Sequence, residues 1–472
     1  MIVQISGTML YSSGDNRVST ASKQDVQIAN FGAKADEVAT SDTGTFSLIA
    51  LFKRLLQGIQ TLIATTTSNS AIKYSDSPSL DAFGRLRVSS LTTYLDVKQI
   101  GGFPTLFVDT ELIGTGLRLS EASNSMSVMT VTANGDAVIC QTKQRSLYQS
   151  GKSQLIFLTF YGFQSVANIL KRIGYFSSST TTPFTTDLDG LFFQSDGTGI
   201  SINVYKTGTT INSSPVYQSS WNLDKMDGTG ASGIDLNFSN SQIGVIDFEW
   251  LGVGRIRFGF SVNGLVYYCH EVLNANNIIG TYMTSSNQPL RWEIRRTSGN
   301  GLQSFNWICG SVSSEGAVNE IGKLLSINTG VGFINANTVG TTYALIGLRL
   351  KATELHTIVQ TLSFSLLAGT NDNMIYTLIL NPTVAGTFTY ADVTNSNLQA
   401  AIGAAAGTNT VTGGTNITSG MVAGNLANFA AVDSSLRIGS SIAGTLDTIV
   451  LCATPLSTGL DVYASLNWRE FN

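Results

Sequence analysis

The sequence predicts a mainly β protein, and three features of its composition indicate this fold class. Only 12% of its 472 residues are charged, whereas glycine occurs 47 times and proline 7 times. Serine, threonine and asparagine are abundant in the rest of the chain. This mixture is typical of short strands joined by glycine turns. The low charge and the 43% of hydrophobic residues also fit a chain that buries surface against copies of itself.

The length predicts several domains, because 472 residues exceed what one compact core usually holds. We expect an N-terminal arm and helix over residues 1–75, a jelly-roll-like antiparallel β-sandwich over 76–310 and a second β-domain over 311–472. The second boundary follows Cys309, where the polar stretch SVSSEGAVNE predicts a loop. No apolar run is long enough to span a membrane, so we expect no membrane partner.

One amphipathic helix is predicted near the N-terminus, in the segment TGTFSLIALFKRLLQGIQTLIA. Its apolar side chains alternate at spacings of three and four residues, which is the pattern of a coiled-coil seam. The seam residues are Ile49, Phe52, Leu56, Ile59 and Ile63. So short a helix is marginal alone. Packing on its own domain and self-association both stay open, and the second would make residues 45–63 the assembly element of a homo-oligomer, expected to be a trimer.

A hairpin is predicted around the dipeptide Asn-Gly at 263–264, which favours a tight turn between two strands. This turn pairs Val262 with Leu265, Phe260 with Tyr267 and Phe258 with Cys269. All six side chains then share one apolar face, which places Cys269 in the core. The hairpin and the preceding tryptophan-bearing strand resemble jelly-roll sandwiches of the concanavalin-like kind, at the level of the fold alone.

The preceding strand, in IDFEWLGVGRIRFGF, is predicted to add a third member to this meander. Its aromatic residues share a face with the apolar residues of the next strand only if the residue numbers of opposed residues add up to an even number. A three-residue loop over 252–254 satisfies this condition and pairs Trp250 with Ile256. Glu249, Arg257 and His270 then lie side by side on the polar face of the meander.

The segment DAFGRLRVS resembles a segment of structural proteins of tailed bacteriophages. Its residues are Asp81, Ala82, Phe83, Gly84, Arg85, Leu86, Arg87, Val88 and Ser89. KRIGYF at 171–176 and SLNWREF at 465–471 are also similar to that group. The resemblance implies a virion structural protein, such as a tail fibre, spike or head-associated fibre. Such a protein is made in the host cytoplasm and assembles with copies of itself and with other virion proteins.

The arginines of this segment have two interpretations. Arg85 and Arg87 share one face of an extended strand, and Leu86 and Val88 share the other. The arginines either contact an acidic partner on the virion or form a polar outer face, and we expect the outer face.

The sequence predicts no catalytic, cofactor or metal site. Its two histidines, His270 and His356, lie in no metal-ligand motif. The four cysteines are scattered, which favours free core thiols. No nucleophile-elbow or phosphate-binding motif opens a helix. The net charge of −4 gives no basic surface for nucleic acid.

Two acidic pairs and a group of aromatic residues keep alternatives open. Asp224 and Asp227 suit either a calcium ion or, as we expect, a plain turn. Asp247 and Glu249 suit either a glycosidase pair or, as we expect, a charge-paired and solvated face. Aromatic residues such as Tyr267, Tyr268 and Trp292 would suit a platform for a host surface glycan, although core positions are expected. A glycan-binding module and a glycan-cleaving tailspike are therefore the alternatives to a structural protein.

Overall fold

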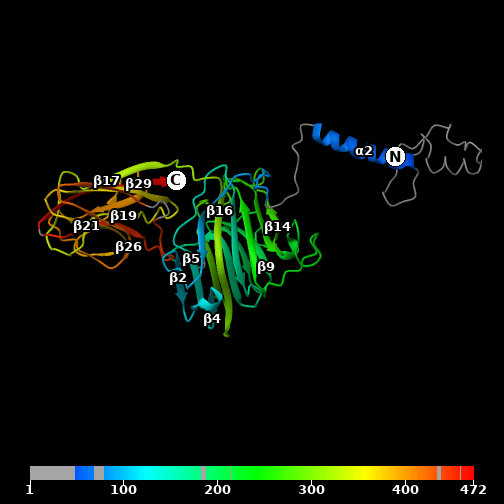
Figure 1. The fold of residues 1–472 in the computed structure, drawn as a ribbon. Helices are drawn as coiled ribbons and strands as arrows, with labels where there is room; N and C mark the ends of the chain where they lie inside the picture. The colour runs from blue at the N-terminus through cyan, green and yellow to red at the C-terminus, as the bar shows by residue number, and fades with distance from the viewer. Residues whose placement is uncertain are drawn as a thin grey trace, which may run out of the picture. The chain divides into compact units, whose positions relative to one another are not determined.

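The computed structural model describes residues 48–67, 79–181, 188–212, 214–432, 437–457 and 459–471. The chain divides into two compact units, Met1–Ser75 and Asp76–Asn472. The fold class predicted above is confirmed. The described strands form antiparallel, sandwich-like sheets, and the α-helix of the described residues lies near the N-terminus (Figure 1).

The helix α2 spans Leu48–Thr67. It therefore extends to Thr67, past the end of the segment TGTFSLIALFKRLLQGIQTLIA in which the sequence predicts it. Threonine is only a moderate helix former, so its weak preference gives way to propagation from the apolar turns before it. Asp42, Thr43 and Thr45, whose side-chain oxygens could cap the start of the helix, lie outside the described residues. None of the described helices combines the length and apolar character that a bilayer span requires.

Two eight-stranded sheets form the first sandwich of the unit Asp76–Asn472. The first sheet, called sheet one, contains β1 (Leu91–Lys98), β3 (Leu117–Glu121), β4 (Met126–Val131), β6 (Gln154–Tyr161), β12 (Gln242–Phe248), β13 (Ile256–Val262), β14 (Leu265–Val272) and β16 (Gln303–Glu315). Sheet two contains β2 (Val108–Ile113), β5 (Ala137–Thr142), β7 (Ile169–Ser177), β8 (Asp189–Ser195), β9 (Ile200–Lys206), β10 (Thr209–Thr210), β11 (Val216–Tyr217) and β15 (Leu290–Arg296). Short 3₁₀ turns occupy η2 (Ala122–Asn124) and η3 (Gln218–Ser220).

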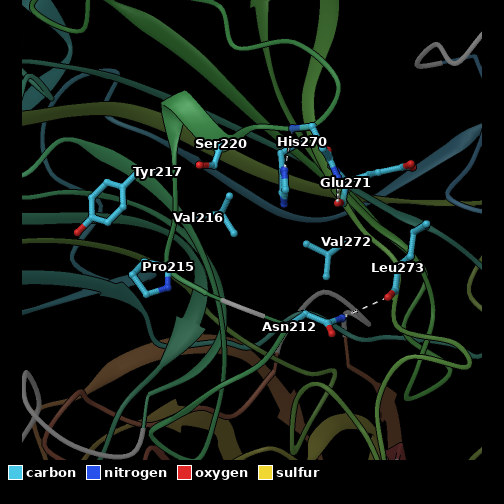
Figure 2. Close-up of a pocket in the computed structure, with 10 residues that line it drawn as sticks. Asn212, Pro215, Val216, Tyr217, Ser220, His270, Glu271, Val272 and Leu273 are labelled. Atoms are coloured by element: carbon cyan, nitrogen blue, oxygen red, sulfur yellow. Dashed lines mark hydrogen bonds between the residues drawn. The ribbon is translucent and has the colours of Figure 1, made fainter.

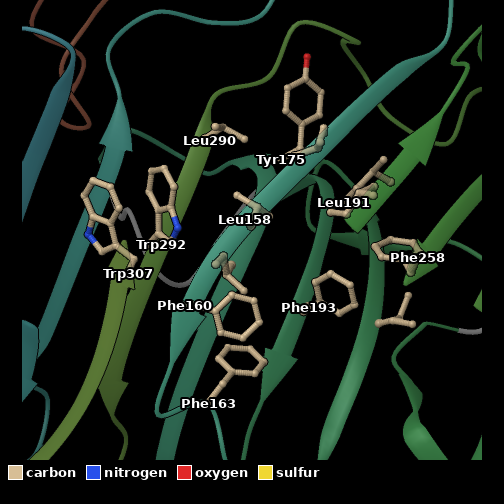
Figure 3. Close-up of a cluster of buried hydrophobic side chains, with 14 of the residues drawn as sticks. Leu158, Phe160, Phe163, Tyr175, Leu191, Phe193, Phe258, Leu290, Trp292 and Trp307 are labelled. Carbon is tan, nitrogen blue, oxygen red and sulfur yellow. The ribbon is translucent and has the colours of Figure 1, made fainter. Parts of the chain in front are cut away.

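Aromatic side chains from both sheets fill the core of this sandwich (Figure 3). Trp292 on β15 stacks on Trp307 on β16, with ring centroids 4.3 Å apart and an angle of 16° between the rings. Phe193 on β8 contacts Phe258 and Phe260 on β13. These contacts join the inner faces of the two sheets, as expected of a sandwich.

A second hydrophobic core lies between the sheets of the C-terminal part and includes Trp468. One sheet contains β17 (Lys323–Asn328), β18 (Ile334–Ala336), β20 (Ile358–Ala368), β27 (Ala427–Ala431) and β29 (Leu460–Phe471). The other contains β19 (Tyr343–Leu350), β21 (Met374–Leu380), β23 (Ala391–Asp392), β24 (Leu398–Ile402), β26 (Thr415–Val422) and β28 (Thr448–Pro455). A small pair joins β22 (Thr383–Val384) to β25 (Val411–Thr412).

The strand β16 continues to Glu315, although the sequence predicts a loop from residue 311. Ser311, Ser313 and Ser314 pair with β1 on one side and with β6 on the other. Val312 between them is fully buried in the first core. Backbone pairing on both sides therefore outweighs the polar composition on which the loop prediction rests.

The meander of β12, β13 and β14 forms, but its register differs from the prediction. Phe248, and not Trp250, lies opposite Ile256, so the sum of opposed positions is even but two lower than predicted. The connection is longer than three residues, and Leu251 and Gly252 adopt positive φ there. The amide of Gly254 donates to the carbonyl of Trp250 over 2.7 Å. Phe248, Ile256 and Phe258 share the buried face, as predicted, whereas the loop is longer than predicted.

The Asn-Gly hairpin pairs Val262 with Leu265 and Phe260 with Tyr267, as predicted. Beyond these pairs a β-bulge shifts the register, so Phe258 lies opposite His270 and not Cys269. Cys269 is nevertheless fully buried in the core, as predicted, because the bulge turns it inward.

Candidate functional site

The phage-like segment forms a strap, defined here as residues 79–89, on the outer face of sheet one. A short bridge between Leu80 and Leu86 closes the strap into a turn. The carboxylate of Asp81 accepts hydrogen bonds from the backbone amides of Phe83 and Arg85, at 2.9 and 2.8 Å. Gly84 adopts a φ of +78°, which favours glycine. Asp81 and Gly84 thus shape this turn.

Ion pairs fasten the strap to the sheet. Arg87 contacts Asp247 on β12 at 2.6 Å and Glu315 on β16 at 2.9 Å. Arg85 contacts Glu249 at 2.7 Å and also pairs with Asp81. The side chains of Arg87, Asp247 and Glu249 are only 7%, 0% and 1% exposed. The strap therefore covers a charged patch that the sequence predicts to be solvated.

The strap has the opposite orientation to the expected one. Arg87 is only 7% exposed and Arg85, although 51% exposed, turns its guanidinium group to Glu249, whereas Leu86 is 48% and Val88 is 88% exposed. A buried carboxylate without a cation costs several kcal/mol, which exceeds the roughly 1.5–3 kcal/mol gained by burying one aliphatic side chain. The carboxylates of the sheet therefore attract the arginines, and the leucine and valine face outward. The predicted polar outer face is wrong.

The predicted row of Glu249, Arg257 and His270 does not form. The side chain of Arg257 pairs with Asp247, and its neighbour across the β13–β14 ladder is Glu271. The bulge at Cys269 moves His270 out of this row, and the longer loop moves Glu249 to Arg85. Asp247 also accepts a hydrogen bond from the hydroxyl of Tyr268 at 2.8 Å.

Glu249 is the member of this cluster with the most altered acidity. Burial raises its pKa to about 7, and the attraction of Arg85 opposes this shift. Its Oε1 atom is buried and accepts no hydrogen bond from the described residues. Asp247 and Glu249 face the strap and line neither of the two pockets described below.

The helix α2 exposes its apolar side chains within the described part of the chain. The exposed members are Leu48 (44%), Phe52 (58%), Leu55 (58%), Leu56 (53%) and Ile59 (43%). Ile49 is half-buried, and the side chain of Ile63 lies outside the described residues. Three of the five predicted seam residues are thus exposed, together with Leu48 and Leu55. We call this set the α2 stripe.

The other sequence candidates take structural roles. Asp224 accepts hydrogen bonds from the amides of Met226 and Ser232, and Asp227 from that of Thr229, as in a plain turn. No group of three potential metal ligands occurs in the described ranges. Trp292 and Tyr268 are buried, so these rings do not form an exposed platform.

The four cysteines are free, as predicted. Cys140, Cys269 and Cys452 are buried, whereas Cys309 is half-buried. The hydroxyl of Thr159 lies 3.3 Å from the sulfur of Cys309. The sulfur of Cys269 lies 3.4 Å from the carbonyl oxygen of Phe258 on the neighbouring strand.

Among the pockets formed by the described residues of Asp76–Asn472, two border the first sandwich. The larger, of about 560 Å³, lies between β11 and β14 (Figure 2). Its lining residues are Asn212, Pro215, Val216, Tyr217, Ser220, Asn222, His270, Glu271, Val272 and Leu273. The smaller, of about 500 Å³, is lined mainly by β1, from Thr93 to Val97.

No protein-family model matches the chain, and no curated protein sequence matches it. Solved structures are similar to about half of the chain. The carbohydrate recognition domain of Emp47p is 10% identical, covers 48% of this chain and 96% of its own, and has a TM-score of 0.28. A legume lectin-like domain from Entamoeba histolytica is 13% identical, covers 49% and 100%, and has the same TM-score. The metal-free VIP36 lumenal domain is similar, at 12% identity. Similarity of this size assigns neither a ligand nor an activity to this chain.

Proposed function

We propose that this chain is a non-enzymatic structural protein of a bacteriophage virion, which assembles as a homo-oligomer through α2. The α2 stripe is the observation that carries the proposal. Leu55 and Leu56 are each more than half exposed in the isolated chain. Large exposed apolar surfaces on one element mark sites of association. A second copy of the same helix offers a complementary surface, because its seam has the same spacing.

The strap supports a structural role for the charged residues. Asp247 and Glu249 are matched by Arg85, Arg87 and Arg257, and all five belong to one intrachain network. Both carboxylates are therefore paired with arginines, whereas a glycosidase would present such a pair to its substrate. The phage-like segment then has a role within the fold, which is to fix the point where the chain enters sheet one.

The experiment that tests this function is competition for incorporation into particles. Wild-type chains and chains with Leu56→Asp and Ile59→Asp, carrying different tags, are expressed together during infection. We expect purified particles to contain the wild-type chain and to lack the variant. A control variant, Leu265→Asp, changes a leucine that is 61% exposed in the hairpin and should be incorporated normally. Absence of the wild-type chain from particles would refute a virion role.

A further inference from the structure

The pocket between β11 and β14 is lined by residues of both strands (Figure 2). β14 is the terminal strand of sheet one, and β11 pairs with β9 near the corresponding end of sheet two. Its volume of about 560 Å³ lies within the range of pockets that hold small molecules. The assembly role proposed above makes no use of this pocket.

His270 supplies a hydrogen-bond donor to the pocket. The backbone amide of Asn222 donates to its Nδ1 atom over 3.2 Å. Nδ1 must therefore be an acceptor, so the ring proton of the neutral imidazole lies on Nε2. Burial lowers the pKa of His270 to about 4, which keeps the ring neutral at pH 7. The side chain is only 7% exposed, and none of the described contacts involves Nε2.

Asn212 and Ser220 supply acceptors and a second donor. The side-chain amide nitrogen of Asn212 donates to the carbonyl of Leu273 at 3.2 Å and to Asn274 at 2.6 Å. Its carbonyl oxygen is the side-chain atom that remains to accept a hydrogen bond. The hydroxyl of Ser220 is exposed and can donate or accept.

The charge of the pocket is already balanced. Glu271 forms an ion pair with Arg255, with 3.1 Å between its Oε2 and the guanidinium nitrogen. An anionic ligand would therefore meet no unpaired cation among the lining residues, and a cationic ligand would compete with Arg255. Pro215, Val216 and Val272 add apolar walls between the polar groups. Such a lining suits an uncharged molecule with hydroxyl groups at its rim and C–H groups on its faces.

We propose that this pocket binds a neutral hexose unit of a glycan. The Nε2–H group of His270 donates to a sugar oxygen, and Asn212 and Ser220 bond to sugar hydroxyl groups. Val216 and Val272 contact the apolar face of the sugar ring. The site differs from the aromatic platform considered in the sequence, because it relies on a histidine and aliphatic walls.

The test uses the full-length chain on an array of neutral, sialylated and sulfated oligosaccharides, and neutral hits are then titrated by calorimetry. Ser220→Trp places a large side chain on the exposed rim of the pocket, and His270→Phe removes the N–H donor while keeping a ring. Ser219→Trp is the matched control, because Ser219 is exposed on the same 3₁₀ turn but does not line the pocket.

We expect binding of neutral oligosaccharides that weakens by about tenfold in His270→Phe, as the loss of one buried hydrogen bond predicts. Ser220→Trp should weaken binding by at least as much, because its indole ring occupies the space of the sugar. Ser219→Trp should bind as the wild type does. The proposal is overturned if neutral sugars fail to bind at concentrations on the order of 10 mM, if Ser220→Trp binds normally, or if only acidic glycans bind. These outcomes leave the assembly role untouched, because no α2 residue is changed.

Discussion

Arg87 and Asp247 lie 160 positions apart in the chain, yet the guanidinium Nη2 atom of Arg87 lies 2.6 Å from Oδ1 of Asp247. The other carboxylate oxygen of Asp247 pairs with Arg257, which is fully buried. One carboxylate thus joins the strap to two strands of sheet one. The strap belongs to the fold of the sandwich.

Removing this carboxylate should destabilise the sandwich strongly. Asp247→Ala leaves Arg87 and Arg257 without their shared anion in a buried site. Breaking a buried ion pair in this way costs about 3–5 kcal/mol, which we expect in the free energy of unfolding measured with urea. The control is Asp96→Ala, which breaks the exposed pair with Lys98 and should leave the midpoint unchanged. Equal urea midpoints for Asp247→Ala and the wild type would show that the ion pairs of Asp247 do not stabilise the sandwich.

Glu249 should make the chain less stable as the pH rises. Its pKa is raised from 4.5 to about 7 in the folded state, so the folded chain binds the proton more tightly than the unfolded chain. Its stabilising contribution is present below about pH 4.5 and is lost as the pH rises through 7. Thermal melting from pH 4.5 to 8 should therefore show a smaller fall for Glu249→Gln than for the wild type. Identical profiles would show that this carboxylate is not perturbed.

His356 should make the chain less stable as the pH falls, which is the opposite of the effect of Glu249. Its Nδ1 atom lies 3.2 Å from Nη1 of Arg145, and burial lowers its pKa from 6.5 to about 3. The folded chain therefore resists protonation, so stability is present above about pH 6.5 and is lost as the pH falls toward 3. His356→Gln should melt with a weaker dependence on pH between 6.5 and 4. A variant more sensitive to acid than the wild type would contradict this interpretation.

Gly310 tests the packing beneath the stacked tryptophans. A Cβ atom at this position would lie 2.8 Å from Cζ2 of Trp292 and 3.0 Å from Cδ1 of Leu290. Overpacking of this kind costs about 1–3 kcal/mol, so Gly310→Ala should lower the free energy of unfolding by that amount. Gly332→Ala is the control, because a Cβ atom there has no neighbour within 4 Å. If Gly310→Ala leaves the free energy of unfolding unchanged, the two sheets can move apart enough to accommodate the added methyl group.

Local patterns allowed much of the fold to be predicted. The alternating or apolar segments at 153–163, 199–208 and 243–250 predict strands, and they lie close to the observed β6, β9 and β12. The agreement follows because burial of one face imposes a period of two residues. The Asn-Gly turn gave the first pairs of the β13–β14 hairpin, since its backbone preference is local. The bulge at Cys269 and the long connection after Phe248 carry no such local signal, and both shifted the register.

The candidate site was less predictable, because its contacts are made at long range. Arg85 and Arg87 were identified as a pair, but their orientation depends on carboxylates that only the folded sheet brings together. Glu315 was missed because it lies in a polar stretch interpreted as a loop. The pocket at His270 depends on the bulge and on the approach of Asn222, neither of which has a sequence motif.

Sedimentation equilibrium of the full-length chain tests the central claim, that the α2 stripe is an assembly surface, most directly. We predict that the wild type sediments with three times the 50.2 kDa mass of one chain, and that the Leu56→Asp and Ile59→Asp double variant sediments as a single chain. Far-ultraviolet circular dichroism of the variant should keep the β signal of the unit Asp76–Asn472. A wild type that sediments at 50.2 kDa, or a double variant with the same mass as an oligomeric wild type, would contradict the claim.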